Sequence, residues 1–357
     1  MEPNTPYSSL PDKAFWRTAV AQKSLFDITG LWDPKFKILP KHNVATYGSC
    51  FAQHIGNALS ERGFSWLRTE VPPTTVPIET AKQYGYHIFS SRTANIYTTS
   101  LLHQWVRWAD GEKSPNLVWK QSNKYFDPFR PKIEPHGFSS EEEVLRLRQY
   151  TIEKFKQSIT EANFFVFTLG LTESWFDRDG FEYPMCPGTV AGEFDAERHQ
   201  FENQSFKFIK DNLLSAIAVM RKMNPKLRFI LTVSPVPLTA TASGKHVLTA
   251  TMHSKSLLRA VAATVSETKH YIDYFPSYEI INSPAFKGVF FEPNMRSVNP
   301  AGVNFVMNSF FQGLHDKFGI NETKERTVSK SNMSPSSVDE EIDQHCEEAL
   351  LEAFGNA

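Results

Sequence analysis

The sequence predicts an α/β protein with a central, mainly parallel sheet. Short apolar runs, each typical of a strand buried on both faces, alternate with longer stretches in which apolar residues have helical spacing. This alternation is typical of parallel sheets, because the helix that links two parallel strands covers one face of the sheet. The 357 residues are enough for one large domain with insertions or for two domains.

The individual strands and helices follow from these patterns. Four apolar runs are the expected strands: residues 43–47, 163–170, 228–235 and 271–275. Helical spacing predicts helices over residues 51–62, 141–159, about 202–223, 254–268 and 300–318. Ser139 or Ser140 is suited to cap the second helix, and Pro300 fits the first turn of the last one.

Some segments lie outside this alternation. Residues 1–42 are rich in proline and polar residues and are interpreted as an irregular arm. Residues 70–140 predict a long, mostly irregular insertion into an α/β domain that covers residues 43–320. Residues 321–337 have the composition of a polar linker. Residues 338–357 predict an acidic amphipathic helix, which either docks on the domain or binds a protein partner.

The composition excludes several classes of protein. The 38 Lys+Arg and 39 Asp+Glu residues nearly cancel, which gives no support for nucleic-acid binding. No run reaches the roughly 18 apolar residues of a membrane span, and the first residues lack the pattern of a secretory signal. The three cysteines are far apart and form neither a disulfide framework nor a zinc motif. We therefore expect a cytoplasmic protein with reduced thiols, no metal and no bound cofactor.

The turn Gly48-Ser49-Cys50 stands between the first strand and the first helix. Ligands of open parallel sheets bind at the carboxyl ends of the strands, and this turn follows such an end. Gly48 would allow a sharp turn and close approach of a substrate. A helix N-terminus favours ionisation of a thiol and can stabilise an oxyanion. The turn is therefore either a nucleophile site or a structural turn, in which Ser49 caps the helix and Cys50 is a small core residue.

The stretch GSCFA at residues 48–52 is the signature of the GSCFA family, and further stretches resemble that family in the same order. They are NIYTT (95–99), FDPFRP (126–131), FTLGLTESW (167–175), CPGT (186–189), LTVSPVPL (231–238), SKSLLRAVA (254–262) and YFPSYEI (274–280). The resemblance covers residues 40–315, approximately. It implies a divergent branch of the SGNH/GDSL hydrolase superfamily, with a flavodoxin-like three-layer α/β/α fold.

The resemblance also implies roles for the first two motifs. The G-D-S block of the superfamily places Cys50 at the nucleophile position, and Ser49 as nucleophile is the competing assignment. The G-x-N-D block is similar to the stretch that starts at Gly170. There Thr172 would replace the asparagine that donates to the oxyanion, and Glu173 would accept a proton or orient a histidine. Capping of the following turn is the structural alternative for both residues.

The D-x-x-H block of the superfamily has no counterpart here. Arg296 and Asn299 stand where its aspartate and histidine would be, but arginine stays protonated and an amide is no base. A base would have to come from elsewhere. His246, in the loop after the third strand, is the preferred candidate, and His253 and His54 are the alternatives, although each of the three can equally be structural.

Two functions from different classes remain open. The resemblance implies an acyl-transfer enzyme, an esterase or an O-acyltransferase, that acts on an acyl ester or thioester with a small-molecule or carbohydrate acceptor. Arg130, Arg296 and Asn299 are candidates for binding a substrate group, and a structural ion pair with Asp127 is the alternative for Arg130. The missing D-x-x-H block instead favours a non-catalytic binding or scaffold protein.

Overall fold

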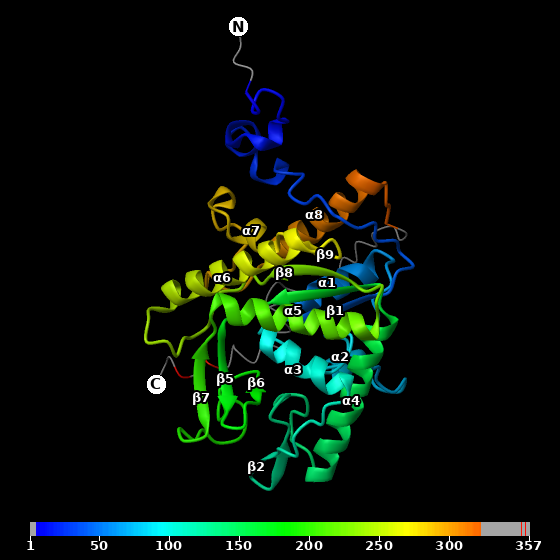
Figure 1. Cartoon of the computed structure of the whole chain (residues 1–357), viewed down its shortest axis with the longest axis vertical. Coiled ribbons are helices and arrows are strands. Elements are labelled where there is room, and N and C mark those ends of the chain that lie inside the picture. The colour runs from blue at the N-terminus through cyan, green and yellow to red at the C-terminus, as the bar shows by residue number, and fades with distance from the viewer. Residues whose placement is uncertain (1–4, 323–350, 352–353, 355–357) are drawn as a thin grey trace.

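A four-stranded parallel sheet forms the centre of the protein. The computed structural model describes residues 5–322, Leu351 and Phe354. The strands stand side by side in the order β1 (Val44–Gly48), β4 (Phe164–Leu169), β8 (Arg228–Val233) and β9 (Ile272–Tyr274) (Figure 1). Every neighbouring pair is parallel. All four strands lie in the apolar runs that predict them and are almost entirely buried.

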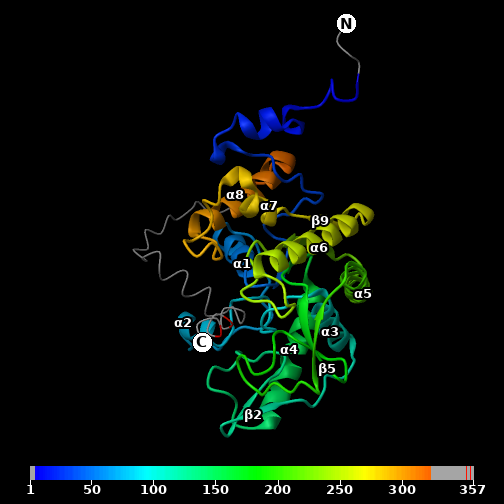
Figure 2. The ribbon, with the colours of Figure 1, turned by 90° about the vertical axis from the view of Figure 1, so that its left-hand side faces the viewer.

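Helices cover both faces of this sheet. One face packs against α3 (Thr99–Asp110), α4 (Glu141–Glu161), α5 (Phe206–Met223) and α6 (Val247–Thr268). The other packs against α1 (Ala52–Glu61), α7 (Ser277–Asn282) and α8 (Pro300–Phe318). Successive residues of a strand point to opposite faces, so Phe165 joins the first core and Phe164 the second. Figure 2 shows the resulting layers, with α8 and α3 on opposite sides of the sheet. The predicted three-layer α/β/α fold is confirmed.

An isolated bridge extends the sheet beyond β1. Trp66 pairs in parallel with Val44, the first residue of β1. With Trp66 counted as the second strand position, the order across the sheet is 2-1-3-4-5, that of flavodoxin-like folds. Gly56 of α1 makes room for the indole, because a Cβ atom there would lie 2.4 Å from the Trp66 ring. The indole N–H donates to the Thr46 hydroxyl at 2.9 Å and fixes the ring in place.

The N-terminal arm is irregular in its first part and packed in its second. The first part forms only short helical turns, η1 (Asp12–Ala14), η2 (Arg17–Ala21) and η3 (Leu25–Asp27). The following apolar residues are buried in the core beside α1 and α8: Ile28, Trp32, Phe36 and Ile38. The Trp32 ring stacks on Phe310 of α8, with 4.7 Å between the centroids. The second part of the arm therefore belongs to the core.

The insertion at residues 70–140 is more regular than the sequence predicts. It contains α2 (Ile78–Gln83), α3, and the hairpin of β2 (Trp119–Gln121) and β3 (Lys124–Phe126). Helix α3 is largely buried, and its cap Thr98 accepts a hydrogen bond from the N–H of Leu101 at 3.1 Å. The prolines and aromatic residues around this helix obscure its pattern in the sequence.

Two further differences lie near the carboxyl ends of the strands. The loop predicted between β4 and α5 contains a small antiparallel sheet, ordered β6 (Glu182–Tyr183), β5 (Glu173–Asp177), β7 (His199–Asn203). Helix α6 begins at Val247 rather than at residue 254.

Other boundaries agree with the sequence. Helices α4 and α8 begin where predicted, and Ser140 caps α4 by accepting from the N–H of Glu143 at 3.2 Å. Most of the predicted linker and the predicted C-terminal helix at residues 338–357 fall outside the described residues. Within the described part of the chain, no helix has the length and apolar character to cross a membrane.

Candidate functional site

The turn Gly48-Ser49-Cys50 leaves the carboxyl end of β1. Gly48 pairs with Thr168 of β4, and the N–H of Ser49 donates to the Thr168 carbonyl oxygen at 3.0 Å. Gly48 has a φ of +132°, and a Cβ atom there would lie 2.3 Å from the same oxygen. Both the backbone conformation and the closeness of β4 therefore require glycine at this position.

Gly170 brings the end of β4 against this turn. A Cβ atom on Gly170 would lie 3.1 Å from the Cβ of Ser49 and 3.0 Å from the ring of Tyr97. The N–H groups of Gly170 and Leu171 both donate to the Tyr97 carbonyl oxygen, at 2.9 and 3.1 Å. After β1 the chain runs through α1 to Trp66, which pairs with one edge of β1, whereas β4 pairs with the other edge. The turn and Gly170 thus meet at the switch point of the sheet, where open α/β sheets bind ligands.

Ser49 and Cys50 are both buried at this point, with 2% and 5% of their surfaces exposed. The hydroxyl of Ser49 has no hydrogen-bond partner among the described residues. Buried polar groups are nearly always hydrogen-bonded, so this hydroxyl is available to a ligand or a water molecule. Neither Cys50 nor Cys186 forms a disulfide bond with another described residue.

The residues after Gly170 are already engaged within the protein. The hydroxyl of Thr172 donates to the side-chain oxygen of Asn203 at 2.7 Å. The carboxylate of Glu173 accepts from the hydroxyl of Thr241 and from the N–H of Ala242. Glu173 therefore holds the loop that leads to His246, and Thr172 would reach an oxyanion only by giving up Asn203.

Lys255 of α6 is a site residue that the sequence analysis missed. Its side chain is 1% exposed, and its Nζ donates to the Gly170 carbonyl oxygen at 2.7 Å. The neighbouring Ser254 accepts from the N–H of Thr172 at 3.2 Å, which fixes α6 against the end of β4. The signal was available, because Lys255 lies three residues before Leu258 and seven before Ala262 on the buried face of α6.

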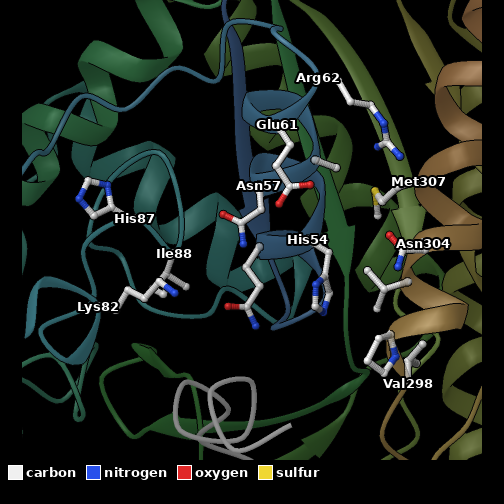
Figure 3. A pocket seen from close by; sticks show the side chains of 14 residues that line it. His54, Asn57, Glu61, Arg62, Lys82, His87, Ile88, Val298, Asn304 and Met307 are labelled. Carbon is white, nitrogen blue, oxygen red and sulfur yellow. The ribbon is translucent and has the colours of Figure 1, made fainter. Parts of the chain in front are cut away.

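The three candidate histidines lie in different environments. His246 is exposed and caps α6, its Nδ1 accepting from the N–H of Leu248 at 3.2 Å. His253 is exposed on α6. His54 lines a cavity of about 250 Å³ between α1 and α8, and Figure 3 shows its ring between α1 and the segment at Val298. Burial lowers the pKa of His54 to about 4, so its imidazole is neutral at neutral pH.

The segment at residues 296–299 leads into the start of a helix. Asn299 caps α8, because its Oδ1 accepts from the N–H of Gly302 at 2.9 Å. Its amide nitrogen donates to the carbonyl oxygens of Val289 and Phe291 at 2.9 and 3.3 Å. Arg296 is half-buried in the loop before it. Asn299 therefore has a structural role as the cap of α8, which a histidine would fill less well.

Arg130 lies in a buried ionic cluster. Its guanidinium is fully buried and donates to Asp127 at 2.8 Å and to the hydroxyl of Thr151 at 2.6 Å. Arg148 of α4 pairs with the same carboxylate at 2.9 Å. The pair with Asp127 is therefore the role that the structure gives Arg130, and no surface of its side chain is open to a substrate.

Glu182, in the small antiparallel sheet that follows β4, is another buried acid. Glu182 of β6 accepts from the hydroxyl of Thr98, and Gln204 links it to the hydroxyls of Ser100 and Ser174 at 2.6 and 3.0 Å. Burial raises the pKa of Glu182 to about 7. Nothing in the sequence marks this glutamate, because its burial comes from the small antiparallel sheet.

Comparison with known proteins identifies one family. A sequence model of the GSCFA family matches residues 43–310. No curated protein and no solved structure matches the chain. The matched range runs from β1 into α8 and includes the turn, Gly170 and Lys255.

Proposed function

The chain belongs to the GSCFA family, and we propose that it is an acyl-transfer enzyme whose nucleophile lies on the turn at residues 48–50. The observation that carries this proposal is the buried, unpartnered hydroxyl of Ser49 beside Gly170, at the switch point of the sheet. Leaving such a group unpaired costs about 1–3 kcal/mol, which a hydrogen bond to a bound substrate would offset. The 2-1-3-4-5 strand order supports the kinship with SGNH/GDSL hydrolases that the sequence resembles.

Cys50 is the first candidate for the nucleophile and Ser49 the second. The thiolate of Cys50 attacks the acyl carbonyl carbon, a C–S bond forms, and the bond to the leaving alcohol or thiol breaks as that group takes a proton. Water or an acceptor hydroxyl, such as that of a carbohydrate, then attacks the acyl-enzyme. This step releases an acid or a new ester and restores the thiol. With Ser49 the same steps pass through an acyl-serine.

Two kinds of side chain are proposed for the proton transfers, a histidine and a lysine, and the contacts of the lysine favour it. His246 stands on the loop that Glu173 holds, and His253 and His54 are its alternatives. Lys255 is the second candidate, because its amine donates to the carbonyl oxygen of Gly170, the residue that packs on Ser49. Lysine replaces histidine as the base in some serine hydrolases.

The oxyanion is proposed to form near the start of α1. Backbone N–H groups at a helix N-terminus carry partial positive charge and stabilise a developing negative charge. Thr172 would add a hydroxyl donor if its bond to Asn203 were exchanged during the reaction. Arg296 remains a candidate for an anionic part of the substrate.

A second candidate function is a non-catalytic binding protein. The observation that favours it is Asn299, which serves as a helix cap where the superfamily has its catalytic histidine. In this case the GSCFA turn would hold a ligand without reacting with it, and the predicted C-terminal helix would bind a protein partner.

Intact-mass spectrometry separates these functions. Wild type, Cys50→Ala and Ser49→Ala are exposed briefly to short acyl thioesters and activated esters. We expect an acyl adduct in wild type and in Ser49→Ala that disappears in Cys50→Ala. Loss only in Ser49→Ala would move the nucleophile to Ser49. No adduct with any donor, together with a Cys50 that alkylates no faster than Cys186, would leave the binding protein as the better conclusion.

A further inference from the structure

We propose that an apolar pocket beside the carboxyl end of β4 binds the acyl group of the substrate, and that this group is an uncharged aliphatic or aromatic chain. The pocket has a volume of about 610 Å³, which is within the range of small-molecule sites. This inference rests on the proposed acyl transfer, because it names the part of the substrate on which the turn would act.

The walls of the pocket are mainly apolar. They come from β5, the loop at residues 184–194 and the loop at residues 238–242. The large side chains that line it are Trp175, Tyr183, Met185, Phe194 and Leu238. The rings of Trp175 and Phe194 meet edge to face, with 5.5 Å between the centroids. An apolar chain that enters the pocket removes its own surface and that of these side chains from water.

The pocket begins one residue along the chain from the glycine that packs on the turn. Leu171 and Glu173 line it, and Leu171 directly follows Gly170. Gly170 in turn lies against Ser49. In this proposal, an acyl group whose carbonyl carbon lies at the turn extends past the end of β4 into the pocket. The cavity at His54 lies elsewhere, between α1 and α8, and is lined largely by polar and charged side chains.

The charges around the pocket disfavour an anionic chain, because its charged lining residues, Glu173 and Glu193, are both acidic. No lysine, arginine or histidine lines it among the described residues, so a second carboxylate on the acyl group would find no cation. Glu173 is already bonded to the loop at Thr241 and Ala242. Burial raises the pKa of the Cys186 thiol to about 11, so this side chain is neutral at physiological pH.

Two apolar side chains from near the end of the chain add to the wall of the pocket. Leu351 and Phe354 line it together with the residues of β5. Phe354 keeps 64% of its surface exposed, so it borders the pocket without filling it. Both side chains extend the apolar surface that an aliphatic or aromatic group would contact.

Calorimetry on the full chain tests the inference without requiring turnover. The probe is N-methyloctanamide, a neutral acyl mimic without an activated leaving group, and N-methylacetamide is the short-chain comparison. Ala240→Trp fills the pocket from an exposed position, and Ala260→Trp on the exposed face of α6 is the matched control. We expect the octanamide to bind wild type and Ala260→Trp at least tenfold more tightly than Ala240→Trp. We also expect it to bind at least tenfold more tightly than the acetamide.

The outcomes separate this inference from the proposed function. Equal binding to Ala240→Trp and wild type, or no binding of the octanamide to wild type, would overturn the pocket assignment. Acyl adducts at the turn could still form in that case and would support acyl transfer alone. Octanamide binding that Ala240→Trp abolishes, without any acyl adduct, would support the pocket and refute the chemistry.

Discussion

The side-chain nitrogen of Lys255 lies 2.7 Å from the carbonyl oxygen of Gly170, inside the protein. Gly170 directly follows β4 and packs on Ser49. A buried amine is costly unless it is hydrogen-bonded, and the amine of Lys255 donates to the backbone beside the proposed nucleophile. We propose Lys255 for proton transfer on the basis of this contact, because neither Arg296 nor Asn299 can act as a base.

Replacing Lys255 tests that role. We expect Lys255→Met to slow the formation of the acyl adduct by about 10²-fold or more, the usual contribution of a general base. The pH profile of the rate of adduct formation should also differ between Lys255→Met and wild type. Lys207→Met, at an exposed position of α5, is the control. A folded Lys255→Met protein with the wild-type rate and pH profile would show that Lys255 only supports the backbone of β4.

Gly48→Ala tests the closeness of β1 and β4 at the turn. A positive φ alone costs a non-glycine residue about 1–3 kcal/mol. We expect the free energy of unfolding to fall by more than this, because the new Cβ atom also meets the Thr168 carbonyl. Gly180→Ala is the control, since its φ is +86° but no atom lies within 4 Å of the added Cβ. Urea unfolding of both variants measures the difference. Equal losses would mean that conformation alone, and not the neighbouring strand, requires glycine at residue 48.

The sheet was predictable from sequence because its strands are unbroken apolar runs, as in Phe164–Leu169. The turn at Gly48 was predictable because glycine, serine and cysteine are adjacent in the sequence at the end of a predicted strand. Lys255 and Glu182 were not, because their burial depends on which distant segments cover them. Helix α3 was obscured by its proline-rich surroundings. Local sequence patterns thus predict the strands and the turn that carry the site. The buried side chains around it, Lys255 and Glu182, are identified only in the folded structure.

Asp127 links the pH dependence of stability to the buried ionic cluster. Burial acts to raise its pKa, but Arg148 and Arg130 outweigh burial and hold the pKa of Asp127 below its usual value. Because the folded pKa is lowered, this stabilisation is present above the unfolded pKa of about 3.9 and is lost as the pH falls through the folded value.

Asp127→Asn should therefore destabilise the protein by about 3–5 kcal/mol at pH 7, since two buried cations lose their partner. It should also flatten the decline in stability below pH 4. Asp211→Asn, which removes an exposed pair with Lys207, should change little. Urea unfolding from pH 3 to pH 7 measures both effects. A decline of equal size in Asp127→Asn and wild type would assign the acid sensitivity to other carboxylates.

Glu182 predicts the opposite pH dependence. Burial raises its pKa to about 7, whereas an unfolded glutamate titrates near 4.3. With a raised folded pKa, the stabilisation is complete below the unfolded pKa and is lost as the pH rises through about 7. The loss is on the order of 3 kcal/mol. Glu182→Gln stays neutral throughout, so its stability should not decline over this range.

The same unfolding experiment between pH 4.5 and pH 8 compares Glu182→Gln with wild type and with Glu197→Gln, an exposed control. The amide keeps the oxygen that accepts from Thr98. It also places N–H donors where the second carboxyl oxygen of Glu182 now has no partner among the described residues. We therefore expect Glu182→Gln to exceed wild type in stability at pH 8 and to match it near pH 4.5. If wild type showed no decline that Glu182→Gln removes, the glutamate would be ionised in the folded protein at neutral pH. Its bonds to Thr98 and Gln204 would then hold a carboxylate behind the end of β4.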